Sequence, residues 1–178
     1  MAERSIHLEK VTYDNVRSVC RLRVAKDQKG FVARNDESLI EAYLTLSDGD
    51  PVFPFAILCG ETVVGFIMID FDDDWEGYGH EAWLSSGDYK FYKGKSFYYI
   101  WRFMIDKKYQ GRGYGKEALK LALDFIRTFP CGAAEYCVLS YEPSNEAAKK
   151  LYSSFGFVEL NEPGYYEEGE EISAVLKL

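Results

Sequence analysis

The sequence predicts an α/β fold with a mixed, mostly antiparallel central sheet of about seven strands flanked by helices. Two observations carry this prediction. Apolar and alternating runs typical of strands are interspersed with runs of helical spacing, in the order β, α, α, β, β, β, α, β, α, β, β. The chain also has 178 residues, 47% of them hydrophobic and 28% charged, which suits one folded domain over residues 1–178.

The N-terminal part of the chain is expected to hold one strand and two short helices. The strand covers residues 5–11, and the first helix is expected to be capped by Thr12 or Asp14. The second helix is expected to begin at a capping box formed by Ser38 and Glu41. Its predicted buried stripe consists of Leu39, Ala42, Tyr43 and Leu46.

Later strands are expected at residues 54–59, 62–69, 98–105, 135–140, 157–160 and 172–178. Gly60 and Glu61 join the first two of these strands in a hairpin, because glycine suits the first position of a tight turn. Two helices are expected among the remaining strands. One has its apolar positions at Leu119, Ala122, Leu123 and Ile126. The other is capped by Ser144 or Asn145 and closed by Gly156.

A glycine-spaced turn connects the buried strand at residues 98–105 to the helix that follows it. The turn consists of Gln110, Gly111, Arg112, Gly113, Tyr114 and Gly115. Glycines let the backbone approach a ligand closely, and the first amides of a helix have no internal partners. Positive charge surrounds the turn in a chain of net charge −8, at Lys107, Lys108, Arg112 and Lys116. The arrangement predicts an anion site, with phosphate as the usual ligand.

Two common phosphate-binding motifs do not fit this turn. It is not a Walker loop, because no Gly-Lys-Ser/Thr follows it. A Rossmann fingerprint would lie near the start of the chain, whereas this turn follows four predicted strands. The glycine spacing by itself therefore predicts an anion site and no particular cofactor.

Composition narrows the possible partners. The acidic balance argues against general nucleic-acid binding, and it fits either a cationic small substrate or solubility alone. The four cysteines have no metal-type spacing, so we expect buried, reduced thiols and no metal at Cys20, Cys59, Cys131 and Cys137. No signal peptide or membrane span is recognisable, which predicts a cytoplasmic protein without membrane contact.

Two motifs together resemble those of the GCN5-related N-acetyltransferase (GNAT) family. The first is Gln110-x-x-Gly113-x-Gly115 after a hydrophobic strand. The second is Asn145-x-x-Ala148-x-x-Leu151-Tyr152-x-x-x-Gly156-Phe157. Both motifs occur in the order and on the elements that this family uses, and the predicted order of strands resembles that of the family over nearly the whole chain.

Within that family the chain is most similar to the bacterial spermine/spermidine (diamine) acetyltransferases. The likeness rests on Gln28-x-x-Phe31-Val32-Ala33-x-Asn35-x-x-Ser38-Leu39 and on Pro54-Phe55-Ala56-Ile57 with Val64-Gly65-Phe66. The chain departs from that branch in two places. The segment at residues 70–95 is longer than expected, and Trp101 precedes Arg102 where the branch leads us to expect an acid.

The resemblance implies that the chain binds acetyl-coenzyme A. The pyrophosphate would lie on the turn from Gln110 to Lys116, which is the anion site described above. The pantetheine arm would pair with the strand at Phe103, Met104 and Ile105 and would contact Asn145. A backbone amide, that of Met104 or Ile105, would hold the oxyanion that forms on the acetyl carbonyl.

The resemblance also implies that Tyr152 contacts the cofactor and acts as the general acid. A positioned phenol can protonate the thiolate that leaves when an amine attacks the thioester. Periodicity alone favours packing in the core, because Tyr152 shares an apolar stripe with Ala148, Leu151 and Phe155.

Several carboxylates are candidates for binding the acceptor amine and for removing its proton. A protonated amine cannot attack, so a carboxylate or a water chain must first remove a proton. Carboxylates that could bind the amine or act as this base are Asp36, Glu37, Glu41, Asp72, Asp73 and Asp74, with further acids up to Glu76. The acidic and aromatic segment at residues 70–95 either lines the site or is an ordered surface insertion that packs on the sheet.

The resulting prediction is an enzyme that moves an acetyl group from acetyl-coenzyme A to a primary amine by direct attack in a ternary complex. A polyamine such as spermine or spermidine is the leading acceptor. The alternatives are another amine, such as a protein lysine or N-terminus or an aminoglycoside, and a non-catalytic sensor domain that binds acyl-coenzyme A. The resemblance also implies a homodimer.

Overall fold

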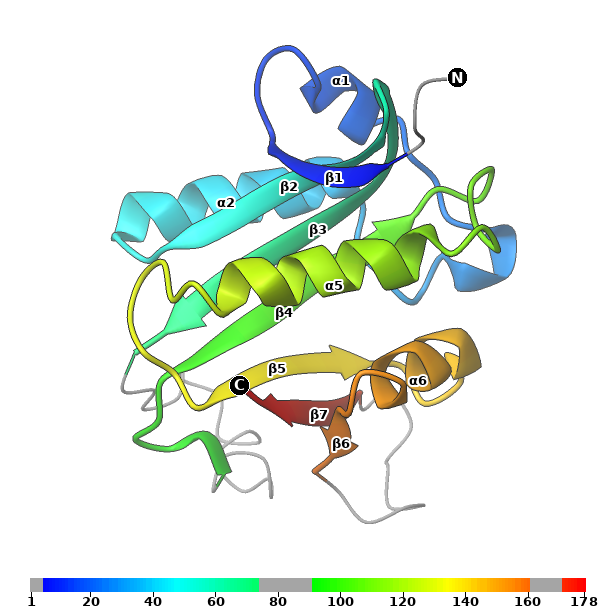
Figure 1. Cartoon of the computed structure of the whole chain (residues 1–178). Coiled ribbons are helices and arrows are strands. Elements are labelled where there is room, and N and C mark those ends of the chain that lie inside the picture. Colours follow the sequence, from blue (N-terminus) through cyan, green and yellow to red (C-terminus); the bar gives the residue numbers. More distant parts are fainter. Residues whose placement is uncertain (1–4, 74–90, 161–170) are drawn as a thin grey trace. The chain divides into compact units, whose positions relative to one another are not determined.

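The structure is a computed structural model that describes residues 5–73, 91–160 and 171–178 (Figure 1). Its strands are hydrogen-bonded in the order β1-β2-β3-β4-β5-β7-β6 within a 7-stranded sheet. The β1–β2, β2–β3, β5–β7 and β6–β7 pairs are antiparallel. The predicted α/β class with a mostly antiparallel sheet is therefore confirmed.

The chain divides into two compact units. The first unit comprises Met1–Asp70 and Ile100–Thr128, and the second comprises Phe71–Tyr99 and Phe129–Leu178. A single acetyltransferase domain over residues 1–178 stays a prediction.

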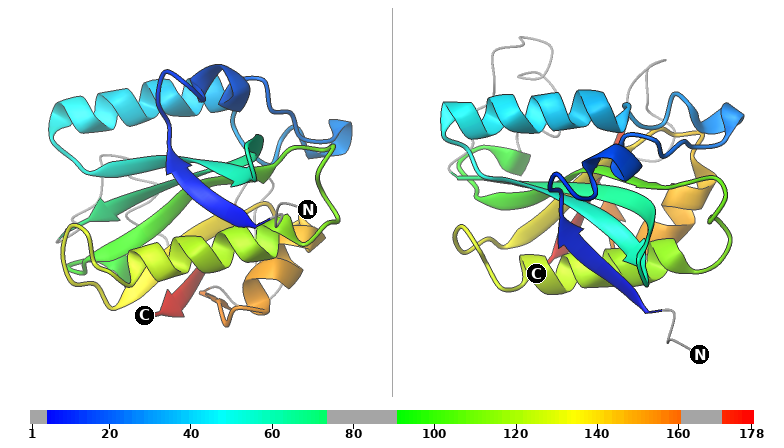
Figure 2. Two further views of the ribbon diagram at one scale, coloured as in Figure 1. Left: turned by 45° about the horizontal axis from the view of Figure 1, so that its top comes forward. Right: turned by 90° about the horizontal axis from the view of Figure 1, so that it is seen from above.

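The first unit has a helix on each face of its strands. Its elements are β1 (Ile6–Lys10), α1 (Val16–Val19), the 3-10 helix η1 (Lys26–Gln28), α2 (Asn35–Asp48), β2 (Val52–Cys59) and α5 (Tyr114–Ile126), with most of β3 (Thr62–Asp72) and β4 (Phe97–Ile105). Figure 2 shows α2 and α5 on opposite faces of β1, β2 and β3. On the α2 side, Val19, Ala42 and Met104 pack into one apolar cluster with Phe66 and Met68.

Two glycines shape the hairpin of β2 and β3. Cys59 pairs with Thr62, so Gly60 and Glu61 form the connecting turn as predicted, and Gly60 has the left-handed φ of 59° that glycine tolerates. Farther along β3, a Cβ on Gly65 would lie 2.5 Å from the carbonyl oxygen of Met104. Glycine is therefore required where the β3 backbone approaches β4 at Met104.

The predicted start of α2 is wrong. The helix begins at Asn35, one turn before the expected capping box, and Ser38 lies inside it with its hydroxyl donating to the carbonyl oxygen of Arg34 at 3.0 Å. The buried residues of the helix are Asn35, Ser38 and Ala42, of which only Ala42 was predicted. Tyr43 and Leu46, which were expected in the core, are 69% and 54% exposed.

Two other expectations need correction. The first helix has Asn15 as its N-cap residue, and neither Thr12 nor Asp14 caps it; the Asn15 side chain instead accepts a hydrogen bond from the amide of Thr12 at 2.9 Å. All four cysteines are free thiols, but only Cys137 is buried, whereas Cys131 is exposed.

Among the described residues, no helix has the length and apolar character needed to cross a membrane.

The second unit is built on β5 (Tyr136–Tyr141) and β7 (Ile172–Lys177), with β6 (Val158–Glu159) and α6 (Glu146–Ser153). Aromatic side chains form its core, and the ring centroids of Phe91 and Tyr136 lie 5.0 Å apart. Phe91 belongs to the C-terminal end of the acidic and aromatic segment. At this end, therefore, the segment packs on a strand, while its residues 74–90 lie outside the described part of the chain.

Asp106 connects the end of β4 to the loop after α1. It is 6% exposed, and its carboxylate accepts hydrogen bonds from the amides of Arg23 at 2.8 Å and Lys108 at 2.9 Å. The amide of Asp106 donates to Val64 at 2.8 Å, and the amide of Lys107 donates to the carbonyl oxygen of Arg23 at 2.9 Å. These bonds set the distance between the two segments.

Replacing Asp106 with alanine is expected to destabilise the protein by about 2–4 kcal/mol, because the amides of Arg23 and Lys108 would lose their acceptor. Urea unfolding followed by circular dichroism measures this change. Asp106→Asn should be less harmful, since its amide oxygen can still accept one bond. Asp50→Ala, at an exposed turn position, is the control. Equal stability of Asp106→Ala and Asp50→Ala would contradict the expectation.

Candidate active site

The predicted anion turn has a backbone that only glycine adopts readily. Gly111 has a φ of 74° and Gly113, the N-cap residue of α5, has a φ of 84°. A Cβ at either position would meet no atom within 4 Å. The constraint at these two glycines is therefore conformational, and the space beside them is open to a ligand.

The amides of this turn are available to an anion. The amides of Lys116 and Glu117 both donate to the carbonyl oxygen of Gly113, at 3.0 and 3.2 Å. Within the part of the chain that the structure describes, the preceding amides, from Gly111 to Gly115, donate to no protein acceptor. Consecutive free amides at the start of a 13-residue helix are the arrangement that holds phosphate.

Side chains around the turn have different roles. The amide nitrogen of Gln110 donates to the carbonyl oxygen of Ile105 at 2.9 Å and to Oε1 of Gln28 at 2.8 Å, so this side chain braces the turn. Arg112 donates to the carbonyl oxygen of Lys108 at 3.0 Å. The hydroxyl of Tyr114 and the thiol of Cys59 are hydrogen-bonded, and this contact raises the pKa of Tyr114. The lysines around the turn, Lys107, Lys108 and Lys116, are exposed.

Residues 103–105 form the end of β4. Phe103 and Ile105 are half-buried, and Met104 is buried, with its sulfur accepting a long bond of 3.8 Å from the side-chain amide of Asn35. The Met104 backbone is the one that approaches Gly65. Its position is thus set both by β3 and by the residue that begins α2.

In the second unit, the two motif residues of α6 have well-defined surroundings. Asn145 is the N-cap residue, and its Oδ1 accepts from the amide of Ala148 at 3.1 Å, which decides between the two predicted caps. Its side-chain nitrogen donates to none of the described residues. Tyr152 is buried against Tyr141 and Phe157, with ring centroids 5.6 and 5.9 Å away.

Burial also sets the protonation of Tyr152. Its pKa is raised above the usual value of 10.0, first by burial and then by the nearby Tyr99, Glu171 and Cys137. Its hydroxyl forms no hydrogen bond with a described residue. Like an unperturbed tyrosine, the phenol is protonated at neutral pH, which a proton donor requires. The core packing expected from periodicity is observed as well.

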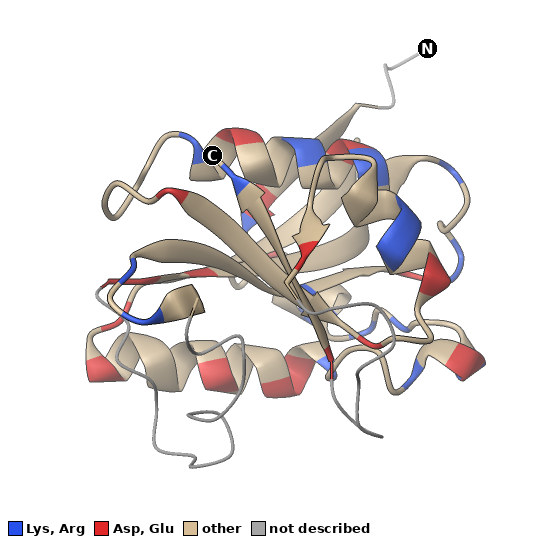
Figure 3. Ribbon diagram, turned by 90° about the horizontal axis from the view of Figure 1, so that it is seen from below, with Lys and Arg blue, Asp and Glu red and all other residues tan. Residues whose placement is uncertain are grey.

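Three acidic side chains of α2 lie next to arginines. Asp36 accepts two bonds from Arg34, at 3.0 and 2.6 Å, and these bonds lower the pKa of Asp36. Glu37 lies 4.0 Å from the same guanidinium. Glu41 pairs with Arg102 at 2.9 Å. Figure 3 shows α2 with acidic but no basic colouring, so these cations come from outside the helix.

The remaining predicted acceptor residues are in or beside the long segment. Asp73 accepts a bond from the hydroxyl of Ser96 at 2.5 Å, and Asp72 is half-buried. Asp74 and Glu76 lie outside the described residues. Trp101, which replaces the expected acid, lies under the guanidinium of Arg102 at 5.0 Å. Among the described residues, no cluster of three or more potential ligands could hold a metal ion.

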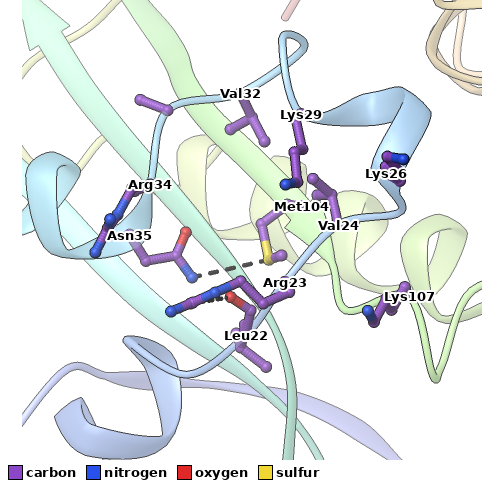
Figure 4. A pocket seen from close by; sticks show the side chains of 11 residues that line it. Leu22, Arg23, Val24, Lys26, Lys29, Val32, Arg34, Asn35, Met104 and Lys107 are labelled. Atoms are coloured by element: carbon purple, nitrogen blue, oxygen red, sulfur yellow. Dashed lines mark hydrogen bonds between the residues drawn. The ribbon is translucent and has the colours of Figure 1, made fainter.

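A pocket that sequence reasoning missed lies in the first unit, beside Met104. Its volume is about 620 Å³, and Figure 4 shows Lys29, Val24 and Val32 directed toward Met104 from the segment between α1 and α2. The sequence does contain a signal for it. Arg21, Arg23, Lys26, Lys29 and Arg34 form a basic run within an acidic chain.

The chain belongs to the acetyltransferase (GNAT) family. The sequence pattern of this family matches residues 17–157. This match includes the glycine turn and the Asn145-to-Phe157 motif. The prediction of an acetyltransferase that uses acetyl-coenzyme A is confirmed by this membership.

Two similar sequences come from Bacillus subtilis. The spermine/spermidine N(1)-acetyltransferase of strain 168 is 27% identical over 158 residues, covering 86% of this chain and 88% of that protein. The probable spermine N(1)-acetyltransferase of subspecies natto strain BEST195 has the same identity and coverage. The predicted likeness to this branch is confirmed.

Solved structures share the fold over nearly the whole chain. The aminoglycoside acetyltransferase AAC(6')-Ib in complex with coenzyme A has a TM-score of 0.66 and 14% identity, over 97% of this chain and 95% of that one. The PaiA N-acetyltransferase of Thermoplasma acidophilum in complex with coenzyme A has a TM-score of 0.61 and 15% identity, over 98% and 99% of the two chains. At these identities the likeness concerns the fold alone.

Gly113→Val is expected to weaken acetyl-coenzyme A binding at least about tenfold, because valine disfavours the left-handed backbone that aims the free amides. Isothermal titration calorimetry with acetyl-coenzyme A measures the change. Gly49→Val is the matched control. Gly49 also has a left-handed φ, of 100°, and open space around it, but it is the C-cap residue of α2 and not part of the glycine turn. If both variants bind equally well, the turn is not the phosphate site.

Proposed function

We propose that this chain acetylates a primary amine by direct attack on acetyl-coenzyme A in a ternary complex. The observation that carries the proposal is the row of free amides from Gly111 to Gly115 at the start of α5. Acetyl-coenzyme A supplies the acetyl thioester. The amides would hold its pyrophosphate, and the exposed Lys108, Arg112 and Lys116 would add positive charge around it.

The chemical roles belong to three further residues. The backbone amide of Met104 is proposed to polarise the acetyl carbonyl and hold the oxyanion, with the pantetheine arm along Phe103 and Ile105. Asn145 can use its free side-chain nitrogen toward the same arm. Tyr152 is proposed to donate its proton to the departing sulfur, and its raised pKa keeps that proton in place beforehand.

For the acceptor, a polyamine is the first candidate. The support is the pair of relatives that are named for spermine or spermidine, at 27% identity. Removal of the amine proton would fall to a carboxylate or a water chain. Asp36 is the weakest of the candidate bases, because its bonds to Arg34 lower its pKa. A homodimer, which rests on the family resemblance, and a cytoplasmic location complete the proposal.

A turnover assay tests the proposal. Purified protein is mixed with acetyl-coenzyme A and one amine at a time, namely spermine, spermidine, an aminoglycoside or a lysine peptide, and the released thiol is measured. Release with at least one amine supports an acetyltransferase. Tight cofactor binding without thiol release from any amine would instead support the non-catalytic sensor domain.

Tyr152→Phe is expected to lower kcat by roughly 10² or more with little change in affinity for acetyl-coenzyme A, because it removes the proton donor and keeps the ring. Tyr136→Phe is the control in the same unit, since Tyr136 makes ring contacts that phenylalanine preserves. Unchanged turnover of Tyr152→Phe would eliminate it as the acid.

The pH dependence gives a separate expectation. Because burial raises the pKa of Tyr152, the phenol keeps its proton as the pH rises through the usual tyrosine range. Loss of activity from deprotonation of this acid should therefore begin only above about pH 10. Steady-state kcat at saturating substrates tests this. The expectation would be contradicted if kcat of the wild type fell at a pH below about 10 while kcat of Tyr152→Phe did not.

A further inference from the structure

The pocket beside Met104 is lined by positive charge. Of its 11 lining residues, five are lysine or arginine and none is aspartate or glutamate. The five are Arg23, Lys26, Lys29, Arg34 and Lys107. All five are exposed, so they form the rim of the pocket. This local charge is opposite to the net charge of −8 of the whole chain.

Most of these cations are not neutralised. The ammonium groups of Lys26, Lys29 and Lys107 form no ion pair or hydrogen bond with any described residue. Arg23 donates only to carbonyl oxygens, those of Cys20 and Leu22, so it keeps its net charge within the pocket. Arg34 is the exception, since Asp36 pairs with it. Four of the five charges therefore remain available to a ligand.

The nearby buried carboxylate does not offset this charge from inside the pocket. Asp106 is 6% exposed, and its oxygens accept from the amides of Arg23 and Lys108. A dication entering the pocket would thus meet several like charges without a free carboxylate on the wall. The same field attracts a carboxylate or phosphate.

The inner walls have a different character. Leu22, Val24, Val32 and Met104 supply apolar surface between the cations, as Figure 4 shows. Apolar walls below a cationic rim suit an aliphatic chain that carries an anionic group. Met104 is also the residue whose backbone amide is proposed to hold the acetyl carbonyl. The pocket therefore adjoins the proposed position of the transferred acetyl group.

We infer that this pocket receives the acceptor and that the acceptor is a primary amine bearing a carboxylate or phosphate. The inference rests on the proposed acetyl transfer to a primary amine, and it replaces the polyamine, which the relatives suggest, with an anionic amine as the acceptor. It ranks acceptors in the opposite order to a polyamine enzyme. The anionic group would interact with Lys26 and Lys29, while the aliphatic part would lie along Val24, Val32 and Met104.

A matched series of acceptors tests this order. The series consists of pentylamine, 5-aminopentanoate, 5-aminopentyl phosphate and 1,5-diaminopentane. Each compound has a primary amine at one end of a similar chain, and the compounds differ in the charge at the far end. We expect kcat/KM to be at least about tenfold higher for the two anionic compounds than for the diamine, with pentylamine between them. The two anionic compounds distinguish a carboxylate from a phosphate preference. Preference for the diamine would overturn the inference.

Charge reversal assigns the effect to the pocket. In Lys26→Glu/Lys29→Glu the order should invert, with the diamine becoming the better substrate. Lys10→Glu, at an exposed position on β1, should keep the wild-type order. An unchanged order in the double variant, with a raised KM for acetyl-coenzyme A instead, would show that these lysines serve the cofactor and would overturn the inference.

A binding measurement separates this inference from the proposed function. Pentanoate and pentyl phosphate lack the reactive amine, so NMR titration reports their binding without turnover. We expect shifts at Val24, Val32 and Met104 that disappear in Lys26→Glu/Lys29→Glu. If neither anion binds there, the inference fails even when amines are acetylated. If no amine is acetylated but the anions bind, the proposed function fails and the pocket keeps only its preference for anions.

Discussion

The buried carboxylate of Asp106 is the constraint on which the ligand-facing part of the first unit depends. It accepts hydrogen bonds from the backbone amides of Arg23 and Lys108. The amide of Lys107 in turn donates to the carbonyl oxygen of Arg23. The glycine turn begins four residues after Asp106, and the cationic pocket begins at Leu22. Both therefore originate from segments that the same carboxylate holds together.

In the first unit, the local surface charge depends on which charged side chains are paired and not on the overall composition. The carboxylates of α2 face guanidinium groups, with Asp36 next to Arg34 and Glu41 next to Arg102. The lysines between α1 and α2 have no such partners among the described residues. An acidic chain can thus present a surface that is locally cationic, because no aspartate or glutamate lines the pocket beside Met104. Net charge alone would have suggested a cationic substrate.

Prediction from sequence succeeded where the signal lies within one element. Gly60 and Glu61 form the expected hairpin turn, Asn145 caps α6, and the turn from Gln110 to Gly115 starts α5. It succeeded only in part at α2, where Ala42 is buried and Leu39 packs against the core, but Tyr43 and Leu46 are exposed. Asn35 and Ser38 can be buried there because the carbonyl oxygens of Val19 and Arg34 accept their bonds. No local pattern reveals the partner of Asn35, which lies 16 positions away.

The sequence by itself determined the order of elements, the glycine turn before α5 and membership of the acetyltransferase (GNAT) family. These depend on glycine spacing, helix caps and hydrophobic periodicity, which act between residues close along the chain. Only the tertiary structure decided which charges are neutralised. The carboxylate of Glu41 pairs with the guanidinium of Arg102 across 61 positions, whereas Asp106 binds only the backbone amide of Arg23, 83 positions away, and leaves the Arg23 guanidinium charged. Such pairs form only when distant segments fold together, so the cationic pocket beside Met104 becomes visible only in three dimensions.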